Sequence, residues 1–176
     1  MDLNFEYRIE GLEKLKTQPT RFEKAYQEAG KEVMVQATAV LARAIVLRFD
    51  RPAGGLPPAV NTGQLRNSVA WRMPTVQGRT IEGGVGTNVA YALPIEFGTR
   101  PHWPPLEPIR FWVERKLRVA PAQVKSVAFL VARKIARRGT QARQIFALGL
   151  EDAKPQMIEI FSRLPKLILQ KMGTSE

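Results

Sequence analysis

The chain contains no cysteine and only one histidine among its 176 residues. The lack of cysteine excludes disulfide bonds, thiolate metal sites and a cysteine nucleophile, but it leaves the compartment open because secreted proteins can also lack cysteine. The histidine, His102, stands six positions after Glu96. An acid–base pair or a metal site there would need a nucleophile or a third ligand at suitable spacing, and neither is present. We therefore expect no enzymatic activity, no metal ion and no cofactor.

Long apolar runs are also missing. The longest, residues 33–47, is interrupted by Gln36, Thr38 and Arg43, whereas a membrane-spanning helix needs about 20 mostly apolar residues. The first fifteen residues carry acids where a signal peptide would carry a basic region. The sequence predicts a soluble protein that is made in the cytoplasm and has no membrane partner.

Acidic residues are few compared with basic ones. Lys and Arg number 27 against 16 Asp and Glu, which gives a net charge of +11. Such an excess attracts polyanions, DNA first among them, and acidic protein surfaces, or it only maintains solubility. The residues expected to face DNA are Arg133, Lys134, Arg137, Arg138 and Arg143. No aromatic side chain lies among them for base stacking, so contact would involve phosphates without reading sequence. A solvated helix end explains the same run equally well.

Helical periodicity dominates the first third of the chain. Apolar residues recur every three or four positions and predict a helix over residues 20–49, preceded by a short strand over 4–9. Between residues 33 and 47 the helix is apolar on nearly all sides, so it needs partners on more than one face. Those partners are either another subunit or the sheet and C-terminal helices of the same chain.

Glycine and proline divide the middle of the chain. Residues 50–60 predict a loop that is disordered in the isolated protein, and residues 68–76 and 80–86 predict a β-hairpin. The stretch 83–99 reads as a strand between two turns. Its glycines are not followed by the Lys-Ser/Thr pair of a phosphate-binding loop, so bulges or close backbone approach explain them better.

The last third predicts further helices. They cover residues 109–117 and 121–137, the second ending at Gly139, and another begins with Thr140 as its cap. Pro155 and Pro165 are expected to kink or break this last helical pattern, and the tail from Gly173 is expected to fray.

Two motifs follow one another in the middle of the chain: T-G-x-L-R-x-S over residues 62–68 and V-G-T-x-x-x-Y-A-x-x-x-E-F-G-T over residues 85–99. The matching residues are Thr62, Gly63, Leu65, Arg66, Ser68, Val85, Gly86, Thr87, Tyr91, Ala92, Glu96, Phe97, Gly98 and Thr99. In order and spacing they resemble the tail-component family of long-tailed bacteriophages, the head–tail joining and tail-completion proteins to which the lambda minor tail protein Z is related. The resemblance covers about residues 10–115, and residues 105–112 depart from the usual ending of the family core.

Pattern and resemblance together set the fold and the function that we expect. The fold is α+β, a long N-terminal helix packed on a small, mostly antiparallel sheet with additional C-terminal helices. Residues 1–120 form the head–tail joining core, and residues 121–176 form a helical extension of the same domain. The resemblance implies a non-enzymatic virion protein of the neck, made in the host cytoplasm, which forms a ring, expected to be hexameric, around the DNA channel.

The resemblance also implies partners. They are head-completion or adaptor proteins, tail-terminator and tail-tube proteins, and genomic DNA through non-specific contact. The alternative is a basic nucleic-acid-binding accessory protein with sequence-independent phosphate contacts.

Subunit contacts are expected at large apolar residues of the long helix, the proline-rich loops and the helix that follows. They are Val33, Val40, Ile45, Leu56, Phe97, Trp103 and Trp112. Trp103 is either an interface anchor or a lid over its own core. Glu96 is expected to cap local backbone donors or to pair with an arginine such as Arg66, and so to fix the loop that follows.

Overall fold

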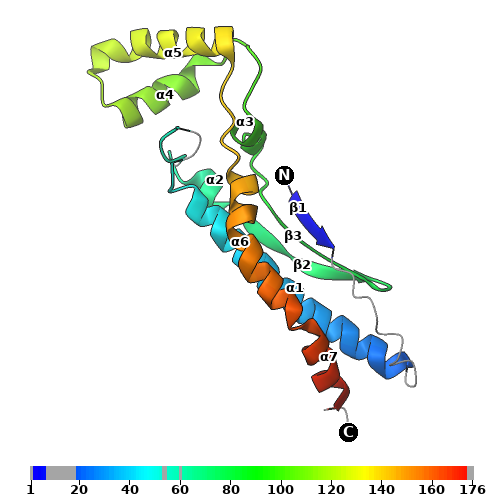
Figure 1. Cartoon of the computed structure of the whole chain (residues 1–176). Helices are drawn as coiled ribbons and strands as arrows, with labels where there is room; N and C mark the ends of the chain where they lie inside the picture. Colours follow the sequence, from blue (N-terminus) through cyan, green and yellow to red (C-terminus); the bar gives the residue numbers. More distant parts are fainter. Residues whose placement is uncertain (1, 7–18, 53–54, 60, 174–176) are drawn as a thin grey trace. The chain divides into compact units, whose positions relative to one another are not determined.

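The computed structural model describes residues 2–6, 19–52, 55–59 and 61–173, and it has the expected α+β fold (Figure 1). The chain divides into two compact units. The first comprises Met1–Leu47, Val69–Asn88 and Ala147–Glu176, and the second comprises Arg48–Ser68 and Val89–Phe146. Each unit is therefore built from segments that are far apart in the sequence, and the residues after 120 are divided between both units.

Helix α1, Pro19–Arg48, is the centre of the first unit and matches the predicted helix within a residue at each end. Its small and aliphatic side chains at every fourth position from Ala25 to Ile45 are buried. Gly30, Met34 and Thr38 lie on the face of α1 that packs on strand β3, Thr80–Gly86. A Cβ atom added to Gly30 would collide with Ile81, and one added to Gly83 would collide with Met34. The predicted close backbone approach at the glycine cluster is thus confirmed for Gly83.

The sheet has three antiparallel strands in the order β1-β3-β2, with β1 at Asp2–Glu6 and β2 at Ala70–Gln77. The predicted β-hairpin is confirmed, and Gly78 in its turn has φ 59°. The predicted N-terminal strand is confirmed over residues 4–6, while residues 7–9 lie outside the described residues. The register shifts between Arg72 and Thr75, where Pro74 cannot donate to the ladder.

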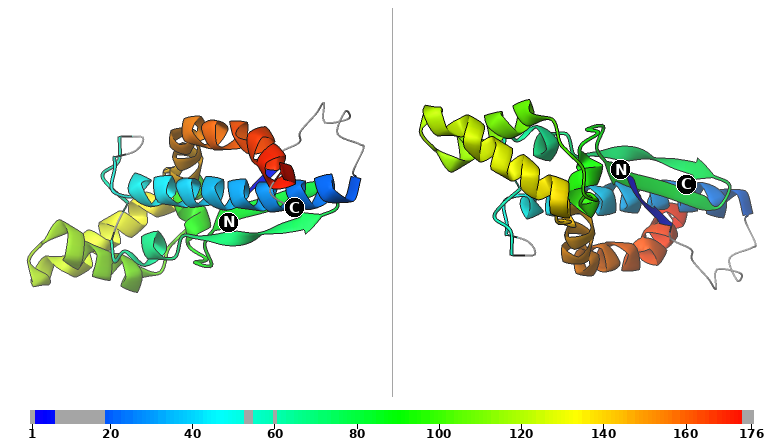
Figure 2. Two further views of the ribbon diagram at one scale, coloured as in Figure 1. Left: turned by 90° about the horizontal axis from the view of Figure 1, so that it is seen from below. Right: turned by 90° about the horizontal axis from the view of Figure 1, so that it is seen from above.

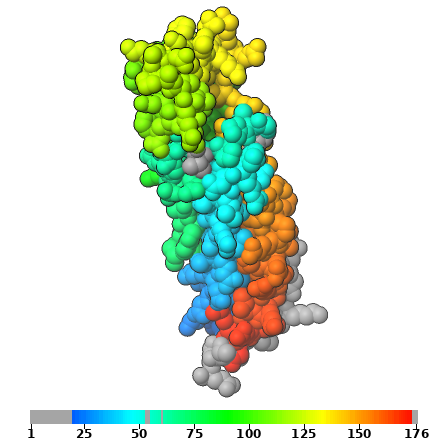
Figure 3. Space-filling model, turned by 90° about the vertical axis from the view of Figure 1, so that its left-hand side faces the viewer, coloured from blue at the N-terminus to red at the C-terminus, as the bar shows by residue number. Residues whose placement is uncertain are grey.

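Helices α6, Ile145–Ser162, and α7, Leu164–Gly173, cover the side of α1 opposite the sheet (Figure 2), and the space-filling view shows them alongside α1 (Figure 3). A Cβ on Gly149 would lie 2.7 Å from Ile45 Cγ1, and Lys171 Nζ lies 3.2 Å from Glu32 Oε2. The chain's own sheet and C-terminal helices therefore cover α1 on two sides.

The two prolines of this region behave differently. A break at Pro155 is wrong, because α6 runs through it without interruption, while the alternative of a kink there stays a prediction. Proline has no N–H to donate to the carbonyl of Glu151, but both residues are exposed, so water can reach that carbonyl. The buried residues Ala153 and Met157 keep their helical spacing of four. Before Pro165 the helix does break, between α6 and α7. The fraying expected beyond Gly173 falls on residues 174–176, outside the described residues.

The second unit is helical. It contains α2, Gln64–Asn67, α3, Ala92–Phe97, α4, Leu106–Leu117, and α5, Val124–Arg138, which follows a 3-10 turn at Pro121–Gln123. The predicted helices near 109–117 and 121–137 are confirmed. Two predictions are wrong: Ala92–Phe97 forms α3 instead of a strand, and Thr140 does not cap a helix, because the next one begins at Ile145. In the 50–60 loop, residues 53, 54 and 60 lie outside the described residues, and the expected disorder stays a prediction.

Candidate assembly surface

Two Gly-Thr dipeptides pair with each other in the second unit, and we call Gly98, Thr99, Gly139 and Thr140 the Gly-Thr clasp. Thr99 N–H donates to Thr140 O at 3.1 Å, Thr140 N–H donates to Thr99 O at 3.2 Å, and the two hydroxyls lie 3.0 Å apart. Both glycines have positive φ, 72° and 69°, with ψ near 180°, a region that is open essentially only to glycine. A Cβ on Gly98 would lie 2.4 Å from Thr140 O, so the two backbones are too close for any side chain.

Pairing continues on the C-terminal side of the clasp. Helix α3 ends with free carbonyls that need donors. Arg143 N–H donates to Ile95 O at 3.0 Å, and Gln144 N–H donates to Glu96 O at 3.1 Å. In Figure 1 the segment that links α5 to α6 accordingly runs beside α3. The segment between Thr99 and Thr140 therefore begins and ends at the same point, where these hydrogen bonds join its two ends.

Glu96 is buried, 1% exposed, and its Oε2 accepts a 2.9 Å hydrogen bond from Phe146 N–H in the first turn of α6. A carboxylate at this position satisfies a donor that has no partner within the helix and lies at the positive end of the helix dipole. Glu96 thus caps a backbone donor, but one that is 50 residues distant and not local. The suggested partner Arg66 pairs with Asp50 instead, at 3.1 Å.

Helices α4 and α5 form an antiparallel hairpin above the clasp. Its core is small: Val113, Val124 and Ala128 are buried, and Ile109, Val119, Val127 and Val131 pack around them. A core of seven aliphatic residues leaves the larger side chains of both helices outside. The guanidinium carbon of Arg115 lies over the Phe111 ring, 5.3 Å from its centroid, and the ring centroids of Trp103 and Phe129 are 5.7 Å apart.

Exposed large apolar residues gather in this part of the chain. Of fifteen such residues in the described structure, ten fall between residues 91 and 130. They are Tyr91, Leu93, Phe97, Trp103, Leu106, Phe111, Trp112, Leu117, Phe129 and Leu130. Exposed apolar residues concentrated in one part of a chain are typical of sites of association.

The residues predicted to make subunit contacts separate into two groups. Phe97 is 66% exposed and Trp103 is 52% exposed, and Trp112 also reaches the surface. Val33 and Ile45 are buried within the chain, and Val40 and Leu56 are half-buried. Trp103 contacts Phe129, and about half of its side chain stays exposed. Among the predicted contact residues, those on α3, on α4 and on the loop between these helices are therefore the most accessible to a partner.

The residues of the first motif build a short structural element around α2. Gly63 has φ 82°, Gln64 N–H donates to Thr62 Oγ1 at 3.3 Å, and Leu65 is buried. Ser68 Oγ donates to Leu65 O at 2.8 Å, which closes the helical turn. Tyr91 of the second motif donates to Gln64 Oε1 at 3.3 Å, so the two motifs meet in space.

The basic residues predicted to face DNA do not form one uniform group. Arg133, Lys134, Arg137 and Arg138 are exposed on α5. Arg143 is half-buried, its Nη1 donates to Pro57 O at 2.6 Å, and burial lowers the pKa of its guanidinium. Arg143 therefore binds the backbone at Pro57, whereas the four α5 residues are available to a ligand.

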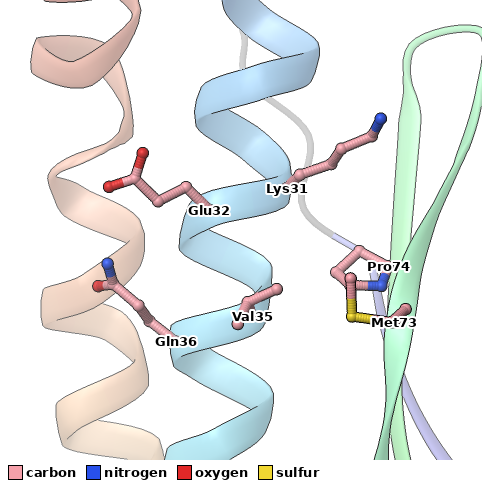
Figure 4. Close-up of a pocket in the computed structure, with 6 residues that line it drawn as sticks. All are labelled: Lys31, Glu32, Val35, Gln36, Met73 and Pro74. Atoms are coloured by element: carbon pink, nitrogen blue, oxygen red, sulfur yellow. The ribbon is translucent and has the colours of Figure 1, made fainter.

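No cluster of three or more metal-binding side chains occurs among the described residues, and His102 Nδ1 is 2.9 Å from Arg100 O. A shallow hollow between α1 and β2 is lined by Lys31, Glu32, Val35, Gln36, Met73 and Pro74, and these side chains do not converge on a common point (Figure 4). None of the helices in the described ranges has the length and apolarity that a membrane crossing requires.

Sequence reasoning missed several members of this surface. It did not pair the clasp, because the dipeptide Gly-Thr occurs at 86–87, 98–99, 139–140 and 173–174 and the repeat alone does not single out the two that meet. It also omitted Phe111, Phe129 and Leu130, which interrupt the polar faces of α4 and α5.

Comparison with known proteins identifies a family. Residues 9–98 match the family model HK97-gp10_like, described as "Bacteriophage HK97-gp10, putative tail-component". No curated protein and no solved structure matches the chain significantly. The matched segment ends at Gly98, so the α4–α5 hairpin follows it.

Proposed function

The chain belongs to the HK97-gp10-like family of bacteriophage tail components, and we propose that it is a structural protein of the head–tail junction that completes the neck of the virion. Membership gives the general role, a structural tail component of the phage particle. The position in the neck and the mode of assembly are the proposed parts.

The observation that carries this proposal is the apolar surface of the second unit. Phe97, Trp103 and Trp112 are exposed on short helices and a proline-rich loop, which fix them with little loss of conformational entropy on binding. Exposed aromatic residues held in this way are typical anchors of protein interfaces. A surface without a cluster of reactive groups is suited to assembly and not to catalysis.

The proposed assembly is a ring of six copies around the DNA channel. Each copy would contact the next through two different patches, because only such heterologous contacts close after a fixed rotation. Head-completion or adaptor proteins would bind one face of the ring, and tail-terminator or tail-tube proteins would bind the other. The exposed cations of α5 would face either genomic DNA, through non-specific contact, or an acidic neighbouring protein.

A nucleic-acid-binding accessory protein is the second candidate, and the net charge of +11 favours it. The two functions predict different behaviour in solution. A neck protein forms large closed oligomers and binds DNA weakly at physiological salt. An accessory protein binds DNA tightly at that salt and stays monomeric or dimeric.

Particle assembly tests the proposed function. A Phe97→Ala/Trp103→Ala double variant is expected to reduce the number of joined heads and tails in complementation of a phage that lacks this chain. Met73→Ala/Ile158→Ala, which removes two exposed apolar side chains from the first unit, serves as the matched control. Normal numbers of joined particles with the Phe97/Trp103 variant would refute the contact assignment.

A further inference from the structure

Positive charge is concentrated in the segment that the Gly-Thr clasp closes. Residues 100–143 carry eleven Lys or Arg and only two Glu, which is a net charge of +9. The rest of the chain holds 16 basic and 14 acidic residues, a net charge of +2. Nearly all of the excess charge therefore lies on the hairpin and its two connecting segments.

Cations and large apolar groups share the same helix faces on this hairpin. On α5, Leu130 lies within one helical turn of Arg133 and two turns of Arg137 along the outward side, and all three are exposed. On α4, Arg115 covers the exposed ring of Phe111. Eight of the eleven basic residues are Arg, the side chain that forms bidentate contacts with carboxylates and tolerates a desolvated interface.

Such a mixed surface favours a protein partner over duplex DNA or a membrane. Phosphates would pair with the cations but would leave Phe111, Leu130 and the Trp103–Phe129 pair without apolar contact. A membrane surface would require the apolar groups of a helix to occupy one side and the charges the other. A protein interface buries aromatic residues and Arg together at its centre.

Charge complementarity also argues against a second copy as the occupant. Two hairpins of charge +9 repel each other, and the rest of the chain, with a net charge of +2, has no overall excess of acid to compensate. We infer that the α4–α5 hairpin, residues 100–143, docks on an acidic, apolar-lined surface of a different protein. This inference rests on the proposed function, in which that protein is a neighbouring component of the virion.

Binding of the full chain to defined polymers tests the inference. The probes are a random copolymer of glutamate and tyrosine, polyglutamate of equal length, a DNA duplex, and vesicles with and without phosphatidylglycerol, all measured at one physiological salt concentration. We expect the chain to bind the copolymer about tenfold more tightly than polyglutamate. Phe111→Ser/Leu130→Ser should abolish that difference, and Arg133→Gln/Arg137→Gln should weaken binding to both polymers.

Matched controls come from exposed residues of the first unit. Ile158→Ser/Leu169→Ser and Lys154→Gln/Lys166→Gln should leave every affinity unchanged, and circular dichroism verifies that each variant keeps its helix content. Sedimentation should show that the hairpin variants retain the oligomeric state of the native chain.

Three results would overturn the inference. One is equal affinity for the two polymers. Another is an apolar variant that loses affinity for duplex DNA or for vesicles but not for the copolymer. The third is loss of self-association in the hairpin variants, which would make a second copy the occupant. None of these bears on whether the chain is found in particles, so the inference and the proposed function can fail separately.

Discussion

Thr99 and Thr140 stand 41 positions apart and each donates its backbone N–H to the carbonyl of the other. This exchange closes the α4–α5 hairpin at its base, and the glycine before each threonine allows the backbones to approach. The charged and aromatic surface of the hairpin is thereby presented by a fixed base and not by a long open loop.

Gly139→Ala is expected to destabilise the protein more than other glycine substitutions. Its Cβ would lie 1.9 Å from Thr99 O, and the residue has φ 69°, so dihedral strain of about 1–3 kcal/mol adds to a backbone clash. Gly78→Ala is the control, because Gly78 has φ 59° but nothing within 4 Å of the added Cβ. Urea denaturation should give the larger loss for Gly139→Ala, and equal losses would show that the clasp is not a close contact.

Glu96→Ala should lower the free energy of unfolding by about 1–3 kcal/mol, because it leaves the buried Phe146 N–H without its acceptor. Glu96→Gln should cost less, since the amide oxygen can accept the same bond. Glu159→Ala, which removes an exposed pair with Arg163, should change stability by under about 1 kcal/mol. If Glu96→Ala were as mild as Glu159→Ala in denaturant titrations, the capping role would be wrong.

Gly149→Ala sets two effects against each other. Alanine favours a helix over glycine by about 1 kcal/mol, but its Cβ would lie 2.8 Å from Ile45 Cα, a backbone atom that cannot turn away. Overpacking of this kind costs about 1–3 kcal/mol, so we expect net destabilisation. A rise in the thermal unfolding midpoint would contradict the close packing of α6 on α1.

Tyr26 gives the stability a pH dependence in the alkaline range. Its hydroxyl donates to Arg79 O at 2.7 Å, and burial raises its pKa above the ordinary value, an effect that the charge of Arg79 partly offsets. Because the folded state holds this proton more tightly, the stabilisation is complete below about pH 10 and is lost as the pH rises through the folded pKa. The difference in unfolding free energy between the native chain and Tyr26→Phe should shrink above about pH 10, and a constant difference would exclude this role.

Local sequence patterns predict an element's type and bounds correctly where the element is long and periodic. Helix α1 was predicted to within a residue because its apolar spacing persists over thirty residues, and the β-hairpin was predicted from strand alternation around Gly78. The short apolar run 91–97 has no clear period and predicts a strand, whereas the structure forms α3, whose last carbonyls accept hydrogen bonds from Arg143 and Gln144.

Local sequence patterns do not predict which residues pair across long distances in the chain. The partner of Glu96 lies 50 residues away, and nothing in the local sequence distinguishes Phe146 from other residues of a helix start. The exposed members of the predicted contact set, such as Phe97 and Trp103, could be named from composition, but the burial of Val33 and Ile45 depends on how α6 and the sheet cover α1.

Cryo-electron microscopy of intact particles tests the central claim most directly, namely that this chain is a structural component of the head–tail junction. We expect a ring of density at the neck into which α1, the three-stranded sheet and the α4–α5 hairpin can be built. A neck that is fully accounted for by other proteins, in particles from which this chain is absent, would contradict the claim.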